Sequence, residues 1–129
     1  DMRRSVYTPA FRNRIHELFE VFDFANQNSA VATRNVTTVA PQALLMLNST
    51  FVMEQARAAA ERALAAKEIT DEKRIQRAFV EAFGRAPSPA EHEIALASLN
   101  NATTDKARLA AWEQLFQALF GCIDFRYVE

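Results

Sequence analysis

Apolar residues return every three or four positions along the second half of the chain, the spacing of an α-helix with one buried face. One such helix is predicted to begin after Thr70, with Asp71 and Glu72 in its first turn, where carboxylates suit the helix dipole. Its apolar face is expected to consist of Ile75, Ala78, Phe79, Ala82 and Phe83. Gly84 then supplies a left-handed stop, a conformation that glycine adopts without a steric penalty.

Two more helices are predicted in the remaining part of the chain. Ser88 and Glu91 have the spacing of a capping box, and Pro89 occupies the first helical position between them. The polar string "NNATTD" interrupts the pattern, and Thr104 is predicted to cap the final helix. The broad apolar face of that helix comprises Leu109, Trp112, Leu115, Phe116, Leu119 and Phe120. Gly121 is expected to stop it, ahead of an aromatic tail.

The stretch "TTVAPQALLMLNSTFV", residues 37–52, could be a binding loop or two helices with a joint. We predict two helices, because Pro41 suits a first helical turn and the apolar run after it is too hydrophobic to face solvent. The core is expected to receive three side chains of this run, Leu44, Leu45 and Leu47. Asn48 or Ser49 is predicted to cap the second helix, since both residues cap helices better than they propagate them.

The helix after this joint is predicted to run from about Thr50 to Lys67. Arg57 and Glu61, four residues apart, are expected to face water. The opposite side carries a narrow stripe of small residues, Val52, Ala56, Ala59 and Ala63. Small side chains let another helix approach closely, so this stripe is predicted to be a helix-packing face.

The first third of the chain has a weaker pattern. Apolar residues at helical spacing predict a helix over residues 10–22, after a short extended segment. Residues 23–36, "DFANQNSAVATRNV", have no period and form the longest predicted loop. Because long ordered loops are often functional, a ligand wall or interface is sought here first. Its candidate residues are Arg34, Asn35 and Asn48.

These patterns predict an all-α fold, a compact bundle of five or six helices with short joints and at most a token strand pair near the termini. The 129 residues suit a single helical domain, and the start at Asp1 is interpreted as that of a C-terminal module excised from a larger protein. With 15 basic and 16 acidic residues, the chain has no electrostatic footprint for nucleic acid. No apolar run is long enough for direct membrane insertion.

Residues with catalytic or metal-binding chemistry are sparse. The single cysteine, Cys122, cannot supply the Cys-x-x-Cys-His motif of c-type haem attachment, and it is interpreted as a small buried hydrophobe. His16 and His92 are far apart in the sequence, so no set of zinc ligands is predicted. The only two glycines, Gly84 and Gly121, cannot form a phosphate-binding loop. We therefore expect no cofactor and no metal in this domain.

Five strings of the sequence, in this order, carry a resemblance: "RRSVYTPAFRN", "LFEVFDFANQN", "RNVTTVAPQALLMLNSTFVMEQARAAAER", "RIQRAFVEAFGRAPSPAEHEIALASL" and "WEQLFQALFGCIDFRYVE". Together they resemble planctomycete-specific domain one, a domain of unknown function, from about Arg3 to Glu129. The resemblance implies the C-terminal domain of an exported or envelope-associated bacterial multidomain protein. It also implies that any haem belongs to a cytochrome-c-like domain elsewhere in that protein. It supplies no catalytic residues.

Two hypotheses about function follow. The first is a non-catalytic helical module that packs against, or recruits partners to, the other domains of its parent protein. The second is an enzyme fragment, in which the 23–36 loop forms one wall of a site that the upstream domain completes. A concave polar pocket lined by Arg34, Asn35 and Asn48 would favour the second, whereas a flat apolar patch without such a pocket would favour the first.

Overall fold

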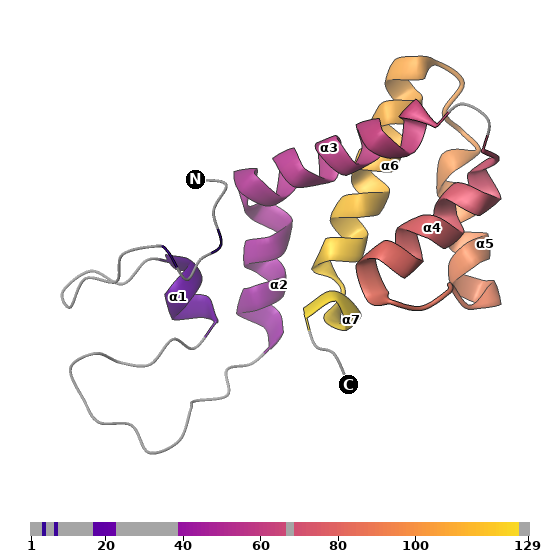
Figure 1. The fold of residues 1–129 in the computed structure, drawn as a ribbon. Helices are drawn as coiled ribbons and strands as arrows, with labels where there is room; N and C mark the ends of the chain where they lie inside the picture. Colours follow the sequence, from indigo (N-terminus) through magenta and orange to yellow (C-terminus); the bar gives the residue numbers. More distant parts are fainter. Residues whose placement is uncertain (1–3, 5–6, 8–16, 23–38, 67–68, 127–129) are drawn as a thin grey trace, which may run out of the picture. The chain divides into compact units, whose positions relative to one another are not determined.

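The computed structural model describes residues 4, 7, 17–22, 39–66 and 69–126, and the ordered elements among them are all helices (Figure 1). The predicted all-α class is confirmed. Seven helices lie in this part of the chain, against the five or six expected, because the structure adds the short helix Ile123–Arg126 near the C-terminal end. No strand occurs among the described residues, and most of the terminal residues where a strand pair was expected lie outside them.

The chain forms two compact units, Asp1–Leu45 and Met46–Glu129. In the first unit, α1 (Glu17–Val21) is the described end of the helix predicted over residues 10–22. The helix α2 (Val39–Asn48) begins in this unit, with Pro41 in its first turn as predicted. Gln42 is buried and its amide Nε2 donates to the Val21 carbonyl at 3.4 Å. The 23–36 loop lies outside the described residues.

The α2 run does not lie in the core as predicted. Leu44 is 60% exposed and Leu47 is 42% exposed, while Leu45 is only half-buried. The helix is apolar on nearly all sides, so its sequence does not indicate which side meets a neighbour. A buried polar residue, Gln42, takes an inward position instead, because its amide finds a backbone carbonyl there.

The joint after α2 is confirmed, because α2 ends at Asn48 and α3 (Thr50–Ala65) begins two residues later. Ser49 occupies the N-cap position with an extended backbone, but its side chain makes no capping hydrogen bond. Residues 37–52 are therefore helical on both sides of a one-residue joint wherever the structure describes them, and the loop alternative is wrong for residues 39–52.

The second unit is built around the contact between α3 and α6 (Asp105–Gly121), which cross each other in Figure 1. The helices α4 (Asp71–Phe83) and α5 (Pro89–Leu99) pack against α6, and the short α7 (Ile123–Arg126) follows it. The predicted small-residue stripe on α3 is confirmed as a packing face. The core consists of Ala56, Ala59, Ala60, Ile75, Ala78, Phe79, Ala95, Leu99, Trp112, Phe116 and Leu119.

Capping explains where the helices of this unit begin and end. The Ser88 hydroxyl accepts from the Glu91 backbone N–H at 3.3 Å, and the Glu91 carboxylate accepts from the Ser88 N–H at 2.7 Å, so the capping box is confirmed. Thr104 caps α6 by accepting from the Ala107 N–H at 3.2 Å. Gly84 ends α4 with φ +71°, the predicted left-handed stop. Thr70 precedes α4 as predicted but makes no side-chain capping bond.

Gly121 does not act as the left-handed stop that was expected, although α6 does end there. A Cβ placed on Gly121 would lie 3.1 Å from Cδ2 of Leu47, which is tighter than ordinary contact. The Leu47 carbonyl also accepts from the Gln117 amide Nε2 at 2.8 Å. Gly121 therefore allows the close approach of the Leu47 side chain to the end of α6.

Candidate functional site

The sequence-predicted site is not assembled by the described residues. Asn48 is the exposed last residue of α2, while Arg34 and Asn35 lie outside the described residues. Whether the three residues share a pocket therefore stays a prediction, as does the role of the 23–36 loop. The ionic clusters, the groove and the cavity that the structure describes lie in the second unit, where the sequence predicted no site.

A buried arginine joins α3 to α4 and α6. Arg74, 8% exposed, donates to the Ala63 carbonyl at 3.0 Å and to the Ala66 carbonyl at 2.6 Å, both at the C-terminal end of α3. Its guanidinium also meets the Asp71 carboxylate at 2.8 Å, and Asp71 accepts from Arg108 at 2.7 Å as well. Asp71 was predicted only as a helix-dipole partner, but it also bridges two arginines. This network holds the fold together and offers no unpaired group for chemistry.

A second ionic cluster ties α7 to the connection between α4 and α5. The Arg85 guanidinium makes two bonds to the Glu91 carboxylate, at 2.9 and 2.8 Å, and one to Asp124 at 2.6 Å. The bonds from Arg85, and then those from Ser88, lower the pKa of Glu91 to about 2. Arg85 also lies over the ring of Phe83, 5.4 Å from its centroid. Each of these charged groups has a partner, so the cluster is interpreted as a structural contact between α7 and the connection from α4 to α5.

Cys122 is exposed, which contradicts its interpretation as a buried hydrophobe. It follows the last turn of α6, and α7 begins at the next residue. Partial burial, together with the carboxylates of Asp124 and Glu91, raises the pKa of its thiol above the usual range. A raised pKa leaves little thiolate near neutral pH, and a thiol in that state is a poor nucleophile.

An apolar groove with a volume of about 330 Å³ lies between α4, α5 and α6 in the second unit. We call it the α5–α6 groove. Ile94 on α5 lies in it with 71% of its surface exposed. Glu91 is its one charged lining residue, and Arg85 already neutralises that carboxylate. The groove is lined by Phe79, Phe83, Glu91, Ile94, Ala95, Ser98, Ala111, Gln114, Leu115, Ala118, Leu119 and Cys122.

A smaller cavity of about 120 Å³ lies between α3 and α4. Arg62, Arg74, Arg77 and Glu81 are its charged lining residues. Arg77 and Glu81 are paired with each other at 2.8 Å, and Arg74 belongs to the network described above. The cavity holds no nucleophile beside a base, so it offers no arrangement for acid–base or covalent chemistry.

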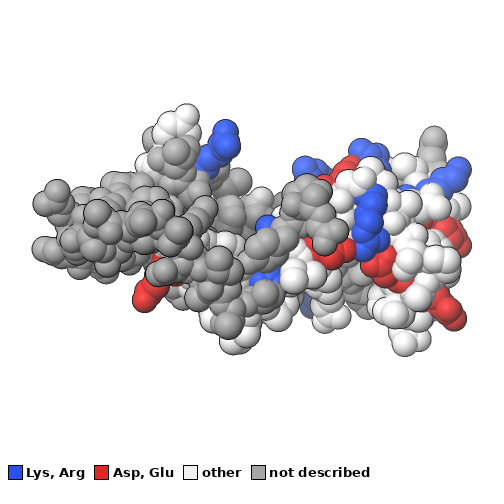
Figure 2. Space-filling view, turned by 90° about the horizontal axis from the view of Figure 1, so that it is seen from below, with Lys and Arg blue, Asp and Glu red and all other residues white. Residues whose placement is uncertain are grey.

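In the part of the chain that the structure describes, neither charged residues nor metal-ligating residues form a further candidate site beyond the groove and the cavity. On the face drawn in Figure 2, blue and red side chains intermingle and neither sign forms a large patch. No three His, Cys, Asp or Glu side chains gather as metal ligands within these described ranges. None of the described helices is both long and apolar enough to cross a bilayer.

The described residues assemble no catalytic centre, and the one charged residue that lines the α5–α6 groove is paired with Arg85. The family of the chain is identified by comparison with known proteins. A family model matches residues 1–99, and the chain belongs to that family, PSD1, a protein of unknown function (DUF1553). The match covers the residues through the end of α5, so it is shorter than the resemblance that the sequence suggested. No curated protein and no solved structure matches the chain.

Proposed function

We propose that this chain is a non-catalytic helical interaction module, which packs against or recruits partners to the other domains of a larger protein. The observation that carries the proposal is the α5–α6 groove, an apolar surface on which Ile94 is left 71% exposed. A large exposed aliphatic side chain beside an apolar groove is typical of an interaction site. The groove adjoins well-packed helices, so it is part of the ordered fold.

The family resemblance supports a particular kind of parent protein, whose other domains supply the partner. The resemblance to planctomycete-specific domain one supports an exported or envelope-associated bacterial parent protein. On this proposal any haem of the parent resides on a cytochrome-c-like domain elsewhere, and this chain binds neither haem nor a stoichiometric metal. The enzyme-fragment alternative rests on the 23–36 loop and stays a prediction, because no observation on the described residues favours it.

The test compares two aspartate substitutions at exposed aliphatic residues. Ile94→Asp places a charge in the α5–α6 groove, while Val80→Asp places one on α4, at a residue 52% exposed that does not line the groove. Each variant is titrated calorimetrically with the remainder of the parent protein, produced separately. Ile94→Asp is expected to weaken association at least about tenfold, or about 1.4 kcal/mol, because it buries an uncompensated charge. Val80→Asp is expected to leave it unchanged.

Equal affinity of the wild type and Ile94→Asp for the remainder of the parent would contradict the proposal. Circular dichroism of both variants checks that neither substitution has unfolded the chain. Ile94 is mostly exposed, so the folded state is expected to survive its replacement.

A further inference from the structure

The cavity between α3 and α4 is separate from the α5–α6 groove, because the two share no lining residue. Its inner surface is apolar and reaches the core of the second unit. Ala59, Ala78 and Phe116 line it there, and each of them is at most 5% exposed. Ile69 and the alanines at the end of α3 extend this apolar surface. An apolar group that enters the cavity leaves water, which is favourable.

Three arginines and one carboxylate are the charged residues that line this cavity. Arg62 lies in the last turn of α3, while Arg74, Arg77 and Glu81 belong to α4. The lining therefore carries more positive than negative charge. A guanidinium is the side chain best suited to bind a carboxylate or a phosphate, because its N–H groups match the spacing of two anionic oxygens.

Arg74 does not contact an anion in the cavity, but it makes the cavity more favourable for one. Its guanidinium already donates to the Ala63 and Ala66 carbonyls and to the Asp71 carboxylate. Carbonyl groups at the C-terminal end of a helix carry a partial negative charge, which repels anions. Since Arg74 occupies two of these carbonyls, the end of α3 no longer opposes an anion nearby.

Arg62 and Arg77 keep donors that a ligand can use. None of the ion pairs between described residues includes Arg62, and the residues three and four positions away from it on α3 are all alanines. Arg77 meets Glu81 at 2.8 Å through its Nε, so its two terminal nitrogens can still donate. Both side chains of that pair are more than half exposed, and exposed pairs contribute little energy. A bound anion can therefore compete with Glu81 for Arg77.

The volume of the cavity, about 120 Å³, limits the ligand to a small molecule. A water-sized group takes roughly 10–15 Å³ of such a volume, so about eight to twelve of these groups fit. We propose that the cavity binds a small organic acid of this size, whose carboxylate pairs with Arg62 and Arg77 and whose apolar part lies against Phe116 and Ala78. Inorganic phosphate would meet the same arginines but would leave the apolar surface without a partner. This site goes beyond the proposed function and does not depend on the α5–α6 groove.

The test is a titration of the 129-residue chain with benzoate, benzamide and inorganic phosphate, followed by the NMR chemical shifts of its backbone amides. Benzoate and benzamide have nearly the same shape, but only benzoate is charged. Benzoate is expected to shift amides of α3 and α4 with a Kd of about 1 mM or below. Benzamide and phosphate are expected to bind at least about tenfold more weakly, and added salt should weaken the binding of benzoate.

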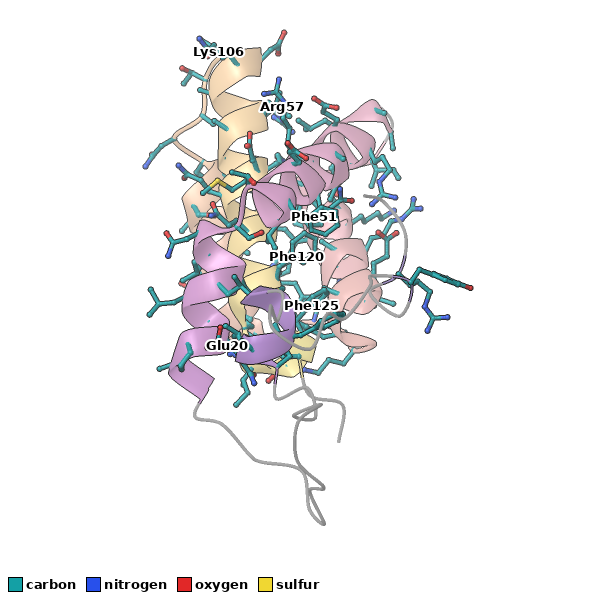
Figure 3. The ribbon with its side chains drawn as sticks, turned by 90° about the vertical axis from the view of Figure 1, so that its left-hand side faces the viewer. Glu20, Phe51, Arg57, Lys106, Phe120 and Phe125 are labelled. Atoms are coloured by element: carbon teal, nitrogen blue, oxygen red, sulfur yellow. The ribbon has the colours of Figure 1, made fainter. Side chains whose placement is uncertain are left out.

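Substitutions separate the cavity from the rest of the surface. Arg62→Gln and Arg77→Gln are each expected to weaken benzoate binding at least about tenfold, because each removes a charged hydrogen-bond donor. Glu81→Gln is expected to tighten it severalfold, since it removes a carboxylate that competes for Arg77. The matched control is Arg57→Gln, at an exposed arginine of α3, labelled in Figure 3, that does not line the cavity. The control is expected to bind benzoate as the wild type does.

Four results would overturn the inference. Equal binding of benzoate and benzamide would show that the cavity does not recognise a carboxylate. Phosphate binding as tight as that of benzoate would show that the apolar surface contributes nothing. Equal losses in Arg62→Gln and Arg57→Gln would indicate a general attraction by surface charge, and no binding of benzoate at ten times the expected Kd would leave no site. Circular dichroism checks that each variant keeps its helical fold, as expected for exposed residues.

Discussion

Gly84 shows how the conformation of one residue fixes the end of a helix. Its φ of +71° is the left-handed conformation, and nothing lies within 4 Å of the position where a Cβ would stand. Substitution there is therefore limited by the backbone and not by neighbouring atoms. The backbone N–H of Gly84 donates to the Val80 carbonyl at 3.0 Å, a bond that closes the last turn of α4.

Gly84→Ala is expected to destabilise the fold by about 1 kcal/mol, because residues with a Cβ are penalised in the left-handed region. Gly84→Asn is the matched control and should cost less, since asparagine tolerates this conformation better. Urea denaturation followed by the fluorescence of Trp112, the single tryptophan and fully buried, measures both. An alanine variant with the wild-type midpoint would mean that α4 can end without the left-handed turn.

Two other residues were misjudged from the sequence, and for the same physical reason. Cys122 was expected to be buried and is exposed, while Gly121 was expected to have a positive φ and instead allows close approach of Leu47. Both outcomes depend on what lies across space from the end of α6. The type of a residue predicts only its average burial. The burial at one position depends on which residues pack against it.

At the scale of the element, the helix boundaries of the second unit could be predicted from local sequence. Ser88, Glu91 and Thr104 form caps with residues no more than three positions away, and the structure contains the capping hydrogen bonds that were predicted. Ser49 and Thr70 stand at the N-caps as predicted but make no capping bond. Residue preference therefore located the helix starts, but it did not determine the hydrogen bonds that satisfy them.

Ser88, whose side chain makes a capping bond, and Ser49, whose side chain makes none, give a matched pair of substitutions. Ser88→Ala is expected to cost about 1 kcal/mol of unfolding free energy, because it removes the acceptor for the Glu91 N–H. Ser49→Ala is expected to cost clearly less, since the Ser49 side chain makes no capping bond. Thermal or urea unfolding of both variants provides the comparison. Equal losses would show that the capping bond of Ser88 contributes nothing beyond residue preference.

The ion pairs of Arg85 with Glu91 and Asp124 stabilise the fold to an extent that depends on pH. The folded-state pKa of Glu91, about 2, is below the usual value of 4.5, so its contribution is complete above about pH 4.5 and is lost as the pH falls toward 2. Glu91→Gln is therefore expected to be less stable than the wild type near pH 6, and the difference should shrink between pH 4.5 and 2. The pair is partly exposed, so added salt should also reduce the difference.

Urea unfolding at a series of pH values checks this prediction. Glu81→Gln is the control, because Glu81 forms a more exposed pair with Arg77 on a single helix and should matter less near pH 6. A difference between wild type and Glu91→Gln that stays constant down to pH 2 would contradict the assigned role of the Arg85–Glu91 bond.

At the scale of the whole molecule, the helical class could be predicted because hydrophobic period and caps are local signals. The packing of α3 on α6 was indicated by the small stripe of Val52, Ala56 and Ala59, which is buried. The exposed side of α2 and the α5–α6 groove could not be predicted in this way, because they depend on which faces remain uncovered after packing. Ile94 continues an apolar pattern in the sequence, yet no described residue covers it.

A row of aromatic residues runs along α6, from the core of the second unit to the C-terminal end of the helix. Trp112, Phe116 and Phe120 follow one another along α6 with ring centroids 6.1 Å apart at each step. Phe120 and Phe125, labelled in Figure 3, continue the row with centroids 5.0 Å apart. The aromatic tail predicted after Gly121 packs against α6 at Phe125, which lies in α7. Ile123 and Phe125 remain 52% and 37% exposed at this end.

The central claim is that the α5–α6 groove is covered in the intact parent protein. The most direct measurement compares the rate of Cys122 modification in the 129-residue chain with the rate in the full-length parent, whose other cysteines are replaced by serine. The account predicts at least about tenfold slower modification in the parent, since a docked segment excludes the reagent. A control chain with Cys122→Ser and Arg57→Cys, which moves the thiol to an exposed residue of α3 that does not line the groove, should react at the same rate in both proteins. Equal rates for Cys122 in the two proteins would contradict the account.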